Sequence, residues 1–251
     1  MKKTKILAAV IAAFALLCGT APVSPLEDMY ENTVITASAA ETETKWDFNK
    51  LWELIAEFSY TKIQIVGSKS ETMDIKTNTS ISNDDSIHAG LGNGDASDTL
   101  YIYAMDSDGK RADQKVKAPN SCSHLFDPVY YTSTLDKETR DKLQTQLQSI
   151  DCSGLDTSDV THMSGMFAHN NALTSLNISG LKTDKVKYMD YMFVSDSALT
   201  ELDVSGFNTE NVEDMSQMFD NCTKPTSLDI SNFNTQKVTD MSRMFYGCER
   251  L

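Results

Sequence analysis

The chain is short of positive charge. It has 22 lysine and arginine residues against 36 aspartate and glutamate residues, which leaves a formal net charge of −14 at pH 7. Proteins that bind nucleic acid neutralise its phosphates with clustered lysine and arginine side chains. The charge balance therefore excludes nucleic-acid binding as the main function and indicates an acidic, hydrated surface.

Long apolar runs are also scarce, since the sequence has one, ILAAVIAAFALLC over residues 6–18, directly after three lysines. It is shorter than the roughly 20 residues that a transmembrane helix needs and is typical of a signal-peptide core. We predict a signal peptide over residues 1–39, with cleavage near Ala39 or Ala40 after the small-residue motif ASA. No transmembrane segment is expected after cleavage. The expected product is extracellular, either secreted or associated with the cell wall.

Cysteine is rare, with five in the chain, and none of them lies in a CxxC motif. Cys18 lies in the apolar run, but Leu17 stands where a lipoprotein has a small residue, so the sequence disfavours lipid attachment. The four histidines form no zinc-site spacing with the cysteines, and we predict no metal and no cofactor. An exported chain with an even number of cysteines could form two disulfides, and the pairing stays open. The four cysteines left after cleavage are Cys122, Cys152, Cys222 and Cys248.

What the sequence does have is a 26-residue internal repeat, which extends over residues 150–251. Six apolar columns hold this register through four copies without an insertion. They are Ile150, Leu176, Leu202 and Leu228; Leu155, Leu181, Phe207 and Phe233; Val160, Val186, Val212 and Val238; Met163, Met189, Met215 and Met241; Met166, Met192, Met218 and Met244; and Phe167, Phe193, Phe219 and Phe245. One such unit cannot bury its own apolar stripe, whereas stacked units can.

Each repeat changes its period along its length. Apolar and polar residues alternate over residues 176–179, which predicts a short half-buried strand. Val186, Met189 and Met192 then follow at helical spacing, and Thr183 stands before them as a candidate helix cap. We therefore predict an α/β repeat solenoid, leucine-rich-repeat-like, with a short strand and a helical turn in each 26-residue coil. The methionines share their stripe with valine and phenylalanine, so core packing is favoured over copper binding.

Residues 40–149 differ from the repeats and are predicted to form an α+β N-terminal capping region. Helical spacing appears over residues 46–55, and a strand pattern follows at residues 63–66. Residues 67–98 are rich in Ser, Asn, Asp and Gly, which predicts a mobile loop. Leucine spacing within residues 134–150 indicates a second helix.

Two shorter patterns complete this region. Residues 99–118 favour a hairpin around Asp108-Gly109, because the acids of MDSDGKRAD do not meet the requirements of an EF-hand loop. SCSHLF, at residues 121–126, is similar to the end of a repeat and indicates a degenerate unit followed by an insertion. His162 and His169 occur in one repeat only and are interpreted as surface variation.

The repeat wording LDVSGFNTENVEDMSQMF (202–219) and LDISNFNTQKVTDMSRMFYGCERL (228–251) resembles the BspA-like group of bacterial surface proteins. That resemblance implies a secreted or wall-attached solenoid, associated with adhesion to host matrix proteins or to other cells, and not an enzyme. Pro225 departs from the pattern, since the other repeats have leucine there. The last repeat is incomplete at Leu251, so we expect the sequence to be a fragment.

If the repeats stack, two polar columns form a solvent-facing stripe beside the strands, a surface that solenoids use for binding. These candidate partner-binding residues are Asp151, Asn177, Asp203 and Asp229, with Ser153, Ser179, Ser205 and Ser231. We predict adhesion or protein–protein interaction through this face, with a protein partner on a host or neighbouring cell. Three alternatives stay open. The columns could only solvate the sheet, the repeats could be the spacer of an exported enzyme with a catalytic domain beyond Leu251, or the protein could be purely structural in the cell envelope.

Overall fold

The structure is a computed structural model that describes residues 45–251, except 59, 69–72, 74, 93–97 and 131–136. All of these residues belong to one unit, Glu43–Leu251. The predicted signal peptide, residues 1–39, and Cys18 lie outside the described residues, as does part of the predicted loop at 67–98.

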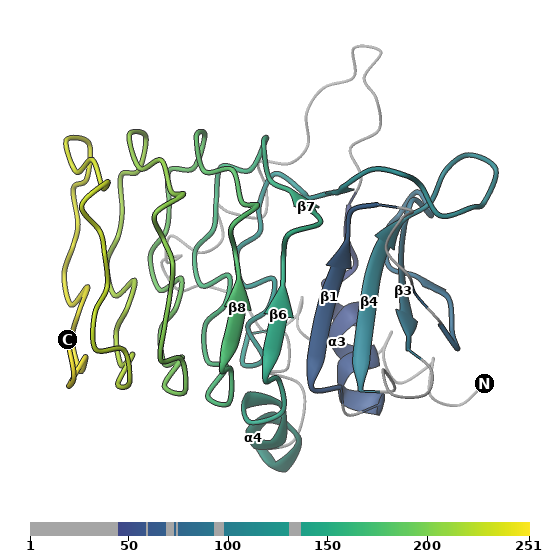
Figure 1. Cartoon of the computed structure of the whole chain (residues 1–251), viewed down its shortest axis with the longest axis horizontal. Helices are drawn as coiled ribbons and strands as arrows, with labels where there is room; N and C mark the ends of the chain where they lie inside the picture. The colour runs from purple at the N-terminus through teal and green to yellow at the C-terminus, as the bar shows by residue number, and fades with distance from the viewer. Residues whose placement is uncertain (1–44, 59, 69–72, 74, 93–97, 131–136) are drawn as a thin grey trace, which may run out of the picture. The chain divides into compact units, whose positions relative to one another are not determined.

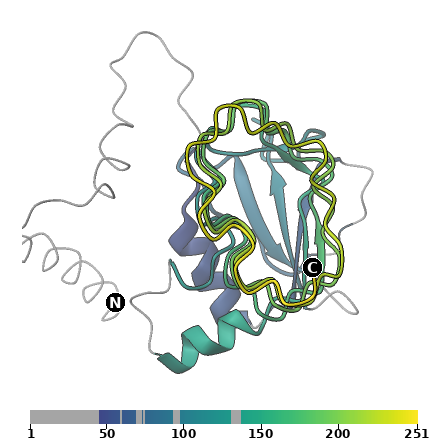
Figure 2. The same ribbon diagram turned by 90° about the vertical axis from the view of Figure 1, so that its left-hand side faces the viewer.

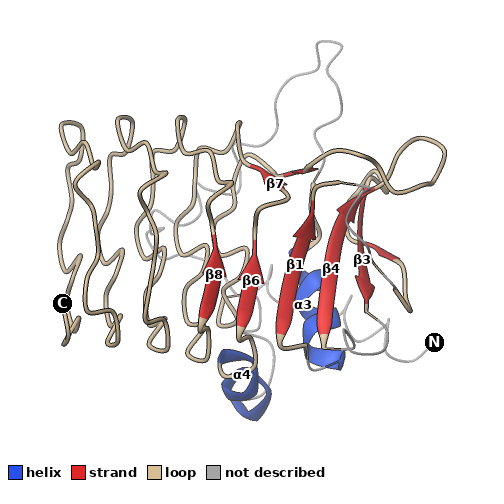
Figure 3. Ribbon diagram, viewed as in Figure 1, coloured by secondary structure: helices blue, strands red, loops and turns tan. Residues whose placement is uncertain are grey.

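The unit contains a six-stranded sheet with the strand order β2-β3-β4-β1-β6-β8. Its strands are β1 (Lys62–Val66), β2 (Thr79–Ser80), β3 (Ile87–Leu91), β4 (Thr99–Ala104), β6 (Ser149–Asp151) and β8 (Ser175–Asn177). β1, β6 and β8 run parallel, with Ile63 opposite Ile150 and Ile150 opposite Leu176. A second sheet pairs β5 (Val116–Lys117) with β7 (Leu155–Asp156). The main sheet therefore continues from the N-terminal region into the repeats (Figures 1 and 3).

Both helices expected from the apolar spacing are present. In α3 (Phe48–Phe58), Leu51 and Ile55 are fully buried and belong to the same core as the inward side chains of β1. Asp47 caps this helix, because its Oδ1 accepts the Lys50 N–H at 3.0 Å. The shorter α4 (Lys137–Gln144) directs Leu143 into the core and ends just before β6.

The prediction of a loop over residues 67–98 is wrong at two places, because that range contains β2 and β3, and every residue of β3 is buried. β3 pairs antiparallel with β4, and its one polar side chain, His88, is satisfied by Asn78 and by the Asp85 carbonyl oxygen. The strand was not predicted because it is short and has polar residues on both sides in the sequence. The hairpin expected around Gly109 is confirmed, with Met105 opposite Arg111.

Equivalent segments of successive repeats lie side by side in parallel. His162, Tyr188, Asp214 and Asp240 are joined by successive parallel bridges. Seen from the end, the coils overlie one another (Figure 2). Their phenylalanines form a stack whose neighbouring ring centroids are 5.5–5.7 Å apart, made by Phe126, Phe167, Phe193, Phe219 and Phe245.

Residues 121–126 lie beside residues 162–167. Ser121 pairs with His162, and the Phe126 N–H donates to the Met166 carbonyl oxygen at 2.8 Å. The expectation of a degenerate unit with an insertion is therefore confirmed, because the chain that joins these two segments is longer than one repeat.

The helical turn expected in each repeat is absent from the described residues, where α4 is the last helix. Consecutive turns take its place, such as Met192 N–H to the Met189 carbonyl oxygen at 3.4 Å. Two residues in each repeat have positive φ, for example Tyr191 at 58° and Ser195 at 63°, which a right-handed helix cannot contain. Spacings of three and four residues suit these turns as well as a helix.

The threonines placed at the expected caps bind the next coil instead. Thr183 Oγ1 accepts the Asn208 N–H at 2.7 Å and donates to the Asn208 carbonyl oxygen at 3.0 Å. Thr157 and Thr209 make the same pair of bonds with Lys182 and Asn234. Each of these buried hydroxyls therefore holds two coils together.

Candidate functional site

The predicted polar columns lie where each coil leaves the strand face, which we define as the side formed by β6, β8 and the equivalent residues 201–203 and 227–229. In every coil the Asp or Asn side chain accepts the N–H of the serine two residues later, at 2.8–3.3 Å. This is the hydrogen bond of an Asx turn. The columns therefore have a structural role, whether or not they also bind a partner.

The four members of the acidic column are not equivalent. Asp151 and Asn177 are half-buried, and Asn177 Nδ2 donates to Asp151 Oδ1 at 3.0 Å. Asp203 and Asp229 are exposed. Hydrogen bonds from Ser205 and Ser231 lower the pKa of Asp203 and the pKa of Asp229. Free negative charge is therefore presented by the third and fourth coils.

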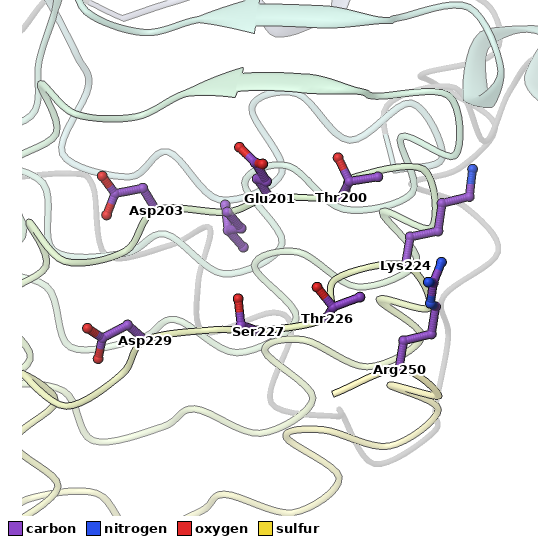
Figure 4. A pocket seen from close by; sticks show the side chains of 9 residues that line it. Thr200, Glu201, Asp203, Lys224, Thr226, Ser227, Asp229 and Arg250 are labelled. Carbon is purple, nitrogen blue, oxygen red and sulfur yellow. The ribbon is translucent and has the colours of Figure 1, made fainter.

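A shallow pocket of about 500 Å³ lies on the strand face of those same two coils. We call it the trough. It is lined by Thr200, Glu201, Leu202, Asp203, Lys224, Thr226, Ser227, Asp229 and Arg250. Figure 4 shows Asp203 and Asp229 at one end and the cationic side chains at the other. The trough therefore has a negative pole and a positive pole.

Sequence reasoning missed the positive pole. Lys224 and Arg250 occupy the positions that Ala172 and Ala198 hold in the first two repeats. This change from alanine to a cation, at the same position of two adjacent repeats, could have indicated the positive pole from the sequence alone. It was missed because the repeat was defined by its apolar columns.

The five charged residues of the trough are unpaired among the described residues, since none of Glu201, Asp203, Asp229, Lys224 and Arg250 forms an ion pair there. Other cations do find partners in the repeats. Lys185 and, from β5, Lys117 both contact Asp159 at 2.6 Å. The trough is thus a place where charge is exposed without an internal counter-charge.

The histidines prove more than surface variation. His169 Nδ1 and His124 Nδ1 contact the two oxygens of Asp127 at 3.1 and 2.8 Å. Burial acts to raise the pKa of Asp127, but hydrogen bonds from His124 and His169 outweigh it and lower that pKa. His162 stacks on Tyr188 with ring centroids 4.8 Å apart. These contacts join neighbouring coils.

The four cysteines of the described unit are free thiols. Cys222 Sγ donates to the Phe193 carbonyl oxygen at 3.2 Å, and Cys248 Sγ does the same to the Phe219 carbonyl oxygen at 3.0 Å. Burial raises the pKa of Cys122 to about 12. Within the described ranges, no group of three or more His, Cys, Asp or Glu side chains could hold a metal ion.

Comparison with protein families gives one finding. Residues 137–251, from α4 through all four repeats, match the family model described as "Mycoplasma protein of unknown function, DUF285". Curated proteins gave no match, and neither did solved structures. Among the described residues, none of the helices has the length and apolar character needed to cross a membrane. The repeat-bearing part of this chain is therefore similar to the DUF285 proteins.

Proposed function

We propose that this is a non-catalytic, secreted or cell-surface protein that binds a protein partner through the strand face of its repeats. The repeats form a leucine-rich-repeat-like solenoid, and residues 40–149 cap it. The constant register between repeats supports this fold class, as does the continuous stack from Phe126 to Phe245. Binding to a partner on a host or neighbouring cell would be adhesion.

The observation that carries the proposal is the unpaired charge of the trough. Asp203 and Asp229 lie in equivalent positions of adjacent coils. Hydrogen bonds from Ser205 lower the pKa of Asp203, and the negative charge of Asp229 opposes that shift as a smaller effect. No cation among the described residues relieves this repulsion by forming an ion pair with either carboxylate. A complementary positive patch on a partner would relieve it, and such complementarity gives specificity and fast association.

The rigidity of the carboxylates supports the same conclusion. Each is held by the N–H of a serine at 2.9 Å, so little conformational entropy is lost when a partner binds. The similarity to DUF285 proteins and the resemblance to BspA-like surface proteins both favour a surface role.

The test compares the wild-type chain with the double variant Asp203→Lys/Asp229→Lys. Immobilised host matrix proteins and whole cells serve as partners. The matched control is Glu53→Lys/Glu210→Lys, which makes the same charge change at exposed residues outside the trough. We expect about tenfold weaker binding for the trough variant, unchanged binding for the control, and unchanged circular dichroism for both. Equal affinities of the trough variant and the wild type would refute the proposal.

A further inference from the structure

We propose that the trough binds an extended segment of the partner polypeptide that carries both charges. A carboxylate of the segment faces Lys224 and Arg250, and a lysine or arginine faces Asp203 and Asp229. This inference rests on the proposed function and specifies the chemistry that the strand face recognises.

The positive pole supplies the first reason. Lys224 and Arg250 are exposed, lie in equivalent positions of adjacent repeats, and form no ion pair with a described residue. Figure 4 shows them one above the other at one end of the trough. Two neighbouring cations repel each other, and a carboxylate placed between them would remove that repulsion.

The negative pole lies across the trough from these cations. Asp203 and Asp229 form it, and Glu201 adds a third carboxylate from the same face. A purely anionic ligand is attracted to one pole and repelled by the other, and a purely cationic ligand meets the same conflict. A ligand with separated opposite charges satisfies both.

The length of the trough sets the length of the ligand. Lys224 and Asp229 are five residues apart along the chain, and an extended chain rises about 3.3 Å per residue, so their α carbons are at most roughly 16 Å apart. An extended peptide whose acid and base are four or five residues apart can reach both poles.

The lining between the poles suits a peptide backbone. Thr200, Thr226 and Ser227 provide hydroxyl groups that both donate and accept hydrogen bonds. Leu202 is half-buried in the same lining and offers an apolar contact. N–H and C=O groups of an extended segment would match this surface.

The test uses three blocked hexapeptides that differ only at their ends, with four alternating glycines and serines between. One has aspartate and lysine ends, one has two lysines and one has two aspartates. Binding to the isotope-labelled full chain is followed by chemical-shift changes at low salt. We expect the dipolar peptide to bind the wild type about fivefold more tightly than either the dilysine or the diaspartate peptide.

Charge reversal should then change which peptide binds best. Lys224→Glu/Arg250→Glu makes the trough wholly acidic and should favour the dilysine peptide. Asp203→Lys/Asp229→Lys should favour the diaspartate peptide, while Glu53→Lys/Glu210→Lys should keep the wild-type order. Absence of these reversals, or equal binding of all three peptides to the wild type, would overturn the inference. If partner binding still depended on Asp203 and Asp229, the proposed function would survive that failure.

Discussion

The first two repeats and the last two have the same apolar pattern but use their polar residues differently. In the first pair, Asp151 and Asn177 are half-buried and joined by a hydrogen bond. In the second pair, Asp203 and Asp229 are exposed and form no ion pair with a described residue, and two added cations lie at the other end of the trough. The shared pattern determines how coils stack, whereas the residues that vary between coils determine where charge is exposed on the strand face.

The same contrast occurs inside the stack, in a slot occupied by Asn170, Asp196, Cys222 and Cys248. Asn170 Nδ2 donates to the Phe126 and Phe167 carbonyl oxygens, and both cysteines donate to the carbonyl oxygen of a phenylalanine in the preceding coil. Asp196 is fully buried and its Oδ2 has no partner among the described residues. Burial raises the pKa of Asp196 well above its usual range. If the carboxyl group of Asp196 is neutral, its O–H can donate a hydrogen bond, as the side chains of Asn170, Cys222 and Cys248 do at the equivalent positions.

The largest loss of stability is expected for a phenylalanine that has a neighbouring ring on both sides in the phenylalanine stack. Phe219 is 1 % exposed and its ring lies 5.6 and 5.5 Å from the rings of Phe193 and Phe245. Phe219→Ala should lower the free energy of unfolding by about 3–5 kcal/mol, because a cavity remains between two rings. Phe245 is 41 % exposed, so Phe245→Ala should cost about 1 kcal/mol or less. Urea unfolding followed by circular dichroism measures both, and equal losses would contradict the closed stack.

Asp196→Asn should stabilise the protein at pH 8 by about 1–3 kcal/mol, since it removes a buried acid and places a donor where Oδ2 has no partner among the described residues. The raised pKa of Asp196 fixes the sign of the pH effect. Its contribution to stability is complete below the unfolded pKa of about 3.9 and is lost as pH rises toward the higher folded pKa. The stability difference between the variant and the wild type should therefore grow with pH.

The control for this effect is Asp203→Asn. The pKa of Asp203 is lowered, so its contribution is present above the unfolded pKa and is lost as pH falls. Exposure makes that contribution small. A stability difference for Asp196→Asn that stays constant between pH 5 and pH 9 would show that Asp196 is not held neutral.

Removing the Thr183 hydroxyl, which joins two coils, should lower the free energy of unfolding by a smaller amount. Thr183 is 1 % exposed and makes two hydrogen bonds with Asn208, so Thr183→Val should cost about 1–2 kcal/mol. Thr235 is the equivalent residue of the fourth repeat, is exposed, and has no side-chain hydrogen bond with a described residue. Thr235→Val should leave the urea midpoint unchanged. Equal midpoint shifts would show that the bonds to Asn208 contribute nothing.

The sequence was sufficient to predict the register of the repeats, both helices and the hairpin. Each depends on a local pattern, such as the spacing of Leu51 and Ile55 in α3. The turns were missed because tyrosine and glutamine have positive φ at residues 191 and 217, where the stacking of coils overrides local preference. The contact between Asp127 and His169 was missed because residues 42 positions apart meet only after folding.

The site was predicted in part for a similar reason. Column analysis found Asp203 and Asp229, because their spacing equals the repeat. It did not separate them from Asp151 and Asn177, since burial depends on neighbouring coils and not on the column itself. Lys224 and Arg250 keep the 26-residue spacing but replace the alanines of the first two repeats. They were missed because only residue types conserved in all four repeats were considered.

We propose that the third and fourth repeats present the recognition surface. The most direct measurement is binding of the full chain to whole cells at low and high salt, for the wild type, Asp203→Lys/Asp229→Lys and Glu53→Lys/Glu210→Lys. We predict that only the trough variant loses binding at low salt, and that high salt weakens binding of the wild type toward the same level. Retained, salt-sensitive binding by the trough variant would place the recognition surface elsewhere and contradict the account.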